Sequence, residues 1–131
     1  MTQRAVAVQV ERGGRTELME GVSVEAVVNA VRDAFGQRDV TFAITADSAD
    51  DRLLVAVDGS DAFLGLEGAD GVFQFVVTDF AVHQGSRAFV IGGQESDIEA
   101  RYLSDIQTAA TVVEGWLTGI EVTTLGFWEP Q

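Results

Sequence analysis

The chain has no cysteine and no lysine, and it has a single histidine and a single proline. Without cysteine, disulfide bonds, thiolate nucleophiles and cysteine-based zinc sites are excluded. Without lysine, the chain also lacks the cation that phosphate-binding loops use. The only imidazole, His83, has no Ser-His-Asp or Cys-His arrangement that the sequence would let us assemble, so we expect it to be structural. These absences favour a protein that is not an enzyme.

Acidic residues dominate what is present. Twenty-one carboxylates stand against eight arginines, and the 131 residues carry a formal net charge of −13. This charge repels nucleic acids and anionic membranes, so we expect neither as a direct partner. A basic partner would suit it, but strong acidity by itself fits a shield for a basic protein, a highly soluble cytoplasmic domain and a salt-adapted protein equally well. The hydrophobic share of 47% excludes an acidic disordered tail. A chain of this length is expected to form one domain, residues 1–131.

The start of the chain predicts the cellular location. Residues 5–8 are apolar, but Gln9 and Glu11 interrupt them too soon for a signal peptide or a membrane span. Together with the absence of cysteine, which suits a reducing compartment, this favours a cytoplasmic protein.

Two segments have helical periodicity. Residues from Ser23 to Gly36 contain an apolar stripe with a serine cap and a terminal glycine. The second helix runs to Leu117, with a capping box of Ser104 and Gln107 and with Gly115 indicating close approach of another backbone, most simply the sheet. We expect the stripe residues Val24, Val27, Val28, Val31 and Phe35 to be buried, and also Trp116 and Trp128.

The remaining segments alternate or are rich in β-branched and aromatic residues, and turn residues separate them. Asp-Gly pairs at 58–59 and 70–71 favour tight hairpins. Four of the middle strands should form an antiparallel meander. The element order β-α-β-β-β-β-β-α-β predicts an α+β fold, a mostly antiparallel sheet with both helices on one face and the other face open. The expected strands are residues 4–11, 40–45, 53–58, 62–67, 72–79, 88–92 and 121–128.

Motifs for metals and cofactors are missing. The carboxylates at Asp47, Asp50 and Asp51, and those at Asp58 and Asp61, do not match a calcium-binding loop. The glycines between residues 65 and 71 match no nucleotide-binding pattern and are interpreted as turn residues. We therefore predict neither a metal nor a cofactor.

Two acidic stretches, residues 47–70 and 94–105, suggest a site for a basic partner. Each contains a single arginine. Many charges of one sign on adjoining loops would steer such a partner, and apolar residues between them would add specificity. The predicted contact residues are Asp58, Asp61, Phe63, Glu67, Asp70, Glu95, Asp97 and Glu99.

The C-terminal quarter of the chain resembles a known family. The capped helix of residues 104–117, the Thr118-Gly119 pair and a final strand that reaches Trp128 are similar to the C-terminal region of the Imm1 family of bacterial immunity proteins. The upstream order of an early helix and a meander is similar too. The chain departs from the family at Ile120-Glu121-Val122, where the family commonly has Arg-Pro, and Trp128 falls about one position late.

The resemblance implies a non-enzymatic antidote that binds a cognate protein toxin domain and blocks its active site. The acidic composition agrees with this, because many toxin domains act on anionic substrates and have basic clefts. Two alternatives remain. An acidic secretion chaperone or adaptor would bind an effector without abolishing its activity, and a small ligand-binding or enzymatic α+β domain would need a pocket with convergent polar groups. The sequence does not indicate an oligomeric state.

Overall fold

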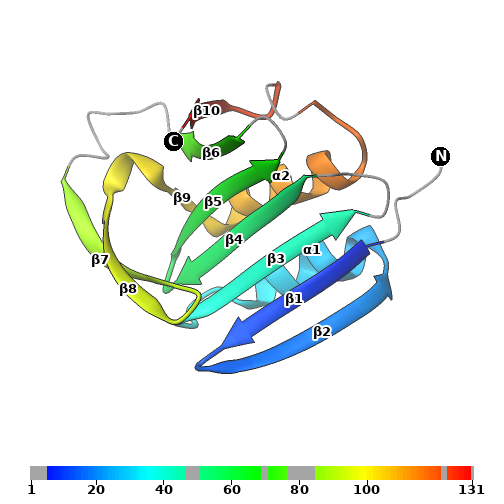
Figure 1. The fold of residues 1–131 in the computed structure, drawn as a ribbon, viewed down its shortest axis with the longest axis horizontal. Coiled ribbons are helices and arrows are strands. Elements are labelled where there is room, and N and C mark those ends of the chain that lie inside the picture. The colour runs from blue at the N-terminus through cyan, green and yellow to red at the C-terminus, as the bar shows by residue number, and fades with distance from the viewer. Residues whose placement is uncertain (1–5, 47–50, 69–70, 77–84, 122–123, 131) are drawn as a thin grey trace.

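The main sheet is antiparallel throughout. In the computed structural model, which describes residues 6–46, 51–68, 71–76, 85–121 and 124–130, seven strands follow the order β10-β6-β5-β4-β3-β1-β2, and the short β9 pairs with β5 (Figure 1). The strands β3 to β6 form the predicted meander, and the α+β class is confirmed. The strands are β1 (Val6–Arg12), β2 (Arg15–Val22), β3 (Val40–Ala46), β4 (Arg52–Asp58), β5 (Asp61–Gly68), β6 (Gly71–Val76), β9 (Leu103–Asp105) and β10 (Phe127–Pro130).

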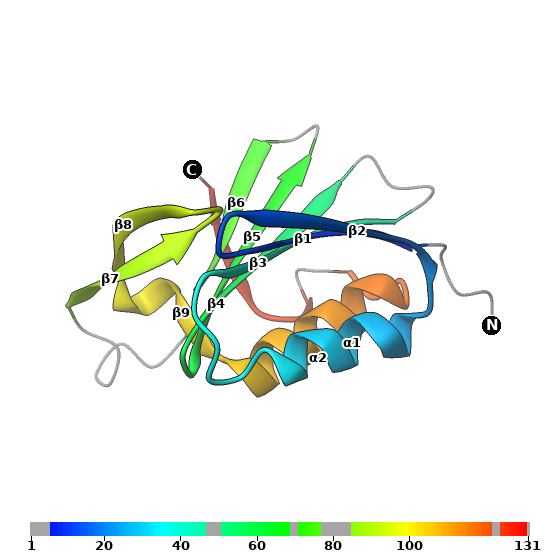
Figure 2. The ribbon, with the colours of Figure 1, turned by 90° about the horizontal axis from the view of Figure 1, so that it is seen from below.

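Both helices cover one face of this sheet, as predicted. Helix α1 (Val24–Asp33) and helix α2 (Ile106–Leu117) lie against each other below the sheet in Figure 2. Alternate residues of β1, β3, β4 and β5 face them, and valine, isoleucine, leucine and phenylalanine fill the interface. Trp116 is 5% exposed and belongs to this core, as predicted. Burial of these apolar side chains is the main driving force for this arrangement.

The helix starts show which sequence signals were reliable. The hydroxyl of Ser23 accepts a hydrogen bond of 3.1 Å from the Ala26 amide, so the predicted cap of α1 is confirmed. The predicted capping box at Ser104 is wrong by one residue. Asp105 is the cap of α2, and its carboxylate accepts from the Thr108 amide at 2.6 Å. The Ser104 hydroxyl instead donates to the Ala62 carbonyl at 3.3 Å, inside the protein.

The predicted close approach at Gly115 is confirmed, but the neighbour is not the backbone of the sheet. A Cβ atom at this position would lie 2.6 Å from the side chain of Leu125, which precedes β10. The helix therefore makes room for a leucine side chain rather than for the backbone of the sheet. Trp128 of β10 is half-buried and meets Phe75 of β6 edge to face, with ring centroids 5.4 Å apart.

A two-stranded ribbon leaves the main sheet, and the sequence did not predict it. The ribbon consists of β7 (Ser86–Ile91) and β8 (Gln94–Glu99), and Gly92 and Gly93 form its turn. We expected residues 88–92 to join the main sheet, and we expected no strand at β2, β8 or β9. The last strand also begins at Phe127 instead of residue 121. Figures 1 and 2 place the ribbon at one end of the sheet, on the side away from the helices.

Candidate functional site

The ribbon is fixed to the sheet by a second, smaller core. Its inward side chains, with Phe89 fully buried, pack on Ala56 of β4 and Phe63 of β5. Leu103 and Tyr102, the latter from the short helix η1 (Ala100–Tyr102), complete this cluster. At the turn, the Gly92 amide donates to the Thr41 hydroxyl of β3 at 2.9 Å. The ribbon is thus held at its turn and along its inner face.

The position of Phe63 corrects its predicted role. This side chain is 5% exposed because the ribbon covers it, so it does not offer a surface to a partner. It supports the ribbon from below. This burial could not be predicted locally, because the residues that cover Phe63 come from β7 and from the segment before α2.

Arg87 of β7 neutralises two of the predicted contact acids. Its guanidinium group donates to Asp58 at 2.7 Å and to Asp61 at 2.5 Å, across the turn between β4 and β5. The Asp58 side chain is only 7% exposed, and Arg38 lies 3.7 Å from its other oxygen. A buried carboxylate needs such a partner. Asp58 therefore holds the ribbon in place, whereas Asp61 is still 35% exposed at the surface.

Three other predicted acids lie on one exposed face of the ribbon. Side chains alternate along a strand, so Glu95, Asp97 and Glu99 project from the same side of β8, and all three are exposed. Glu99 is paired with Arg101 at 2.6 Å. Within the described part of the chain, neither Glu95 nor Asp97 takes part in an ion pair. We call the row Glu95, Asp97 and Glu99 the acidic row.

Arg101 anchors the base of the ribbon to the end of the chain. Its guanidinium group contacts Glu99, and it also donates to Glu129 of β10 at 2.6 Å. The hydrogen bond to Glu99, followed by the one to Glu129, raises the pKa of Arg101 above its ordinary value. The Tyr102 hydroxyl donates to Glu129 at 2.9 Å. These contacts join the acidic row to the main sheet through β10.

The remaining predicted acids lie elsewhere. Glu67 pairs with Arg52, 2.5 Å away on the neighbouring strand β4, on the face of the sheet away from the helices. Asp70 lies outside the described residues, and so do His83, Asp47 and Asp50. Among the residues that are described, no group of three possible ligands is arranged to hold a metal ion. No described helix is long and apolar enough to cross a membrane.

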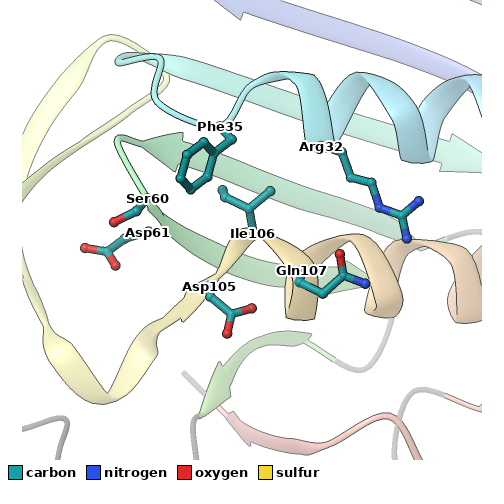
Figure 3. Close-up of a pocket in the computed structure, with 7 residues that line it drawn as sticks. All are labelled: Arg32, Phe35, Ser60, Asp61, Asp105, Ile106 and Gln107. Carbon is teal, nitrogen blue, oxygen red and sulfur yellow. The ribbon is translucent and has the colours of Figure 1, made fainter.

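A hollow of about 500 Å³ opens beside the ribbon, and sequence reasoning did not find it. It lies where the end of α1, the turn between β4 and β5, and the start of α2 meet (Figure 3). Asp61 connects it to the ribbon, since the same carboxylate lines the hollow and pairs with Arg87. The lining residues are Arg32, Phe35, Ser60, Asp61, Asp105, Ile106 and Gln107.

No protein-family model matches the chain, and no curated protein matches it. The acidic row and the hollow are therefore the features from which a function has to be argued.

Proposed function

We propose that this protein is a non-enzymatic inhibitor that binds a basic protein domain, as an immunity protein binds its toxin, and that the acidic row is its contact surface. The proposal is carried by one observation: Glu95 and Asp97 project side by side from an exposed strand and have no ion pair within the described residues. Unpaired carboxylates on a supported strand offer fixed negative charge to a cationic cleft. Such complementarity speeds association and selects the partner.

The build of the ribbon supports this role. Phe89 and Phe63 are buried beneath it, and Arg87 ties it to two carboxylates. A surface that is rigid before binding loses little conformational entropy when the partner arrives. The ribbon that carries the acidic row therefore does not have to become ordered when the toxin binds. The resemblance of the C-terminal quarter to the Imm1 family led to this expectation, although no family model matches the chain.

The test uses a basic toxin-like domain from a gene neighbouring that of this chain, chosen by its toxicity to cells that express it, and two double variants. Glu95→Arg with Asp97→Arg reverses the acidic row, and Glu25→Arg with Glu114→Arg makes the same charge change on exposed helix positions. When the chain is co-expressed with the toxin domain, the wild type and the helix variant should protect the cells. The row variant should bind at least about tenfold more weakly and protect less, because like charges now meet across the interface.

Two outcomes would contradict the proposal. If both variants lose binding equally, overall charge matters and the acidic row has no special role. If the purified chain binds the domain but leaves its catalytic activity unchanged, the protein acts as a chaperone or adaptor.

A further inference from the structure

The hollow is lined by the aromatic ring of Phe35, which the apolar pattern of α1 predicts to be buried. Phe35 continues the spacing of the buried face of α1, yet it is 64% exposed. The prediction that it belongs to the core is wrong, because the helix ends at Asp33 and the cap residue Ala34 is buried in its place. Figure 3 shows the ring extending from the end of α1 over the space beside Ile106, which is 5% exposed. A single exposed apolar residue on a flat surface is common and needs no explanation. An exposed aromatic ring at a concave site is typical of a binding site.

The walls of the hollow are fixed by backbone contacts. The Gly36 amide donates to the Gly59 carbonyl at 2.8 Å, and the Gly59 amide donates to the Gln37 carbonyl at 2.8 Å. These bonds join the end of α1 to the turn that carries Ser60. On the other side, Asp61 of β5 and Asp105 of β9 are direct partners in the strand register. The hollow is therefore formed before anything binds in it.

The charges of the hollow favour a cation at one side. Asp61 and Asp105 are like charges on directly opposed strand positions, an arrangement that destabilises a sheet unless it is compensated. Arg87 compensates Asp61, while Asp105 accepts only the helix-capping hydrogen bond from Thr108 among the described contacts. A basic group bound at Asp105 would supply the missing positive charge.

The opposite side of the hollow offers hydrogen-bond donors. In Figure 3 the side chains of Arg32 and Gln107 lie across the hollow from Ser60 and Asp61. Within the described part of the chain, Arg32 is in no ion pair. Its guanidinium group and the Gln107 amide can donate to the carbonyl oxygens of a bound peptide segment.

We propose that the hollow anchors the partner protein by taking an apolar side chain against Phe35 and Ile106, with an adjacent arginine or lysine at Asp105. This inference rests on the proposed function and names the second part of the same interface. Asp61 lines the hollow and pairs with Arg87 of the ribbon, so the ribbon and the hollow adjoin at this carboxylate. Interfaces of this kind combine a buried apolar anchor with a charged rim.

The test uses three dipeptides and the isolated chain, so it does not depend on any toxin. Acetyl-Phe-Arg-amide is titrated while the backbone and side-chain amide signals of the ¹⁵N-labelled protein are followed by NMR. We expect saturable shifts at Phe35, Ser60 and Gln107, with a dissociation constant of about 1 mM or a few mM, which is usual for so small a fragment. Acetyl-Phe-Glu-amide and acetyl-Gly-Arg-amide should each bind at least about fivefold more weakly, because each lacks one of the two contacts.

Equal binding of the acidic peptide, or shifts elsewhere on the surface, would overturn the inference. So would shifts at these residues that depend only on protein concentration, since the occupant would then be a second copy of the chain. If the row variant loses toxin binding but no peptide enters the hollow, only this inference is wrong. If peptides bind the hollow but no toxin is bound, the proposed function is wrong.

A pair of matched variants extends the test to the toxin. Phe35→Ala removes the ring from the hollow, and Phe127→Ala removes one that is 68% exposed on β10. We expect Phe35→Ala to weaken toxin binding at least about tenfold and Phe127→Ala to change it less than twofold, with similar thermal unfolding for both. Equal effects on binding would show that Phe35 is not an anchor.

Discussion

At the scale of single residues, pairing decides which acids are free to bind. The sequence predicts Asp58 and Asp61 as contact acids because they lie in an acidic stretch. Their partner, Arg87, is 29 residues from Asp58 and 26 residues from Asp61 in the chain, and it reaches them only because the ribbon folds back over β4. No local pattern shows such a pair. Glu95, Asp97 and Glu99 were predicted as contact acids, but their arrangement in a row was not, because the charged segment shows no sign of the strand β8.

Arg87 should therefore matter for stability. Arg87→Met leaves the 7%-exposed carboxylate of Asp58 without its closest cation, and we expect a loss of about 2 kcal/mol in the free energy of unfolding in urea. Arg52→Met, which removes the exposed pair with Glu67, should cost at most about 1 kcal/mol. Adding Asp58→Asn to Arg87→Met should recover part of the loss, because the unpaired charge is gone. A loss no larger than that of Arg52→Met would contradict this role.

The cap of α2 gives a second residue-scale prediction. Asp105→Ala should destabilise the protein by about 1 kcal/mol in urea unfolding, since the Thr108 amide loses its acceptor. Asp105→Asn keeps an acceptor at the same place and should cost much less. Asp105→Asn also tests whether the Asp105 charge binds a basic group in the hollow. It removes the negative charge but keeps the acceptor that caps α2. Equal losses for both variants would mean that capping is not the role of this side chain.

At the scale of elements, the sequence predicted the longer strands that bury one face, and it missed β2 and β8, which do not, and the three-residue β9. The strands β3, β4 and β5 have valine, leucine and phenylalanine facing the helices, so their pattern is visible. The strand β2 is exposed along most of its length, and β8 is rich in charge, so neither shows alternation of apolar residues. The hollow could not be predicted, because three elements meet there that are distant in sequence.

The docking of β10 depends on a glycine. A Cβ atom at Gly126 would lie 2.3 Å from the ring of Phe75, which Trp128 also contacts, and the backbone φ of Gly126 is 154°. Gly126→Ala should displace β10, shift the indole N–H signal of Trp128 in NMR spectra and cost roughly 2 kcal/mol of stability. At Gly119, where φ is 93° and the space is open, alanine should leave that signal in place. An unchanged Trp128 signal in Gly126→Ala would contradict the steric argument.

At the scale of the whole molecule, the negative charge is spread over both layers. Exposed acids occur on β2, at Glu17 and Glu20, and on the helices, at Glu25 and Glu114, as well as on the ribbon. The distribution of charge alone therefore does not indicate which face binds a partner. The ribbon is distinguished because its exposed acids stand in a row, and because Arg87 of the ribbon pairs with Asp61, which also lines the hollow. Under the proposed function, the general negative charge attracts a basic partner over a distance that salt shortens.

This distribution predicts opposite effects on stability and function at the acidic row. Glu95→Arg with Asp97→Arg changes the net charge from −13 to −9 and reduces the repulsion within the folded chain. The free energy of unfolding at low salt should rise by about 0.5 kcal/mol, and the gain should shrink in high salt as screening increases. If the proposed function holds, the same variant should protect cells less against the toxin, because the introduced arginines repel a basic partner. If urea unfolding shows a loss of stability instead, Glu95 and Asp97 hold the ribbon together, and the lost protection would reflect a damaged fold rather than a missing contact.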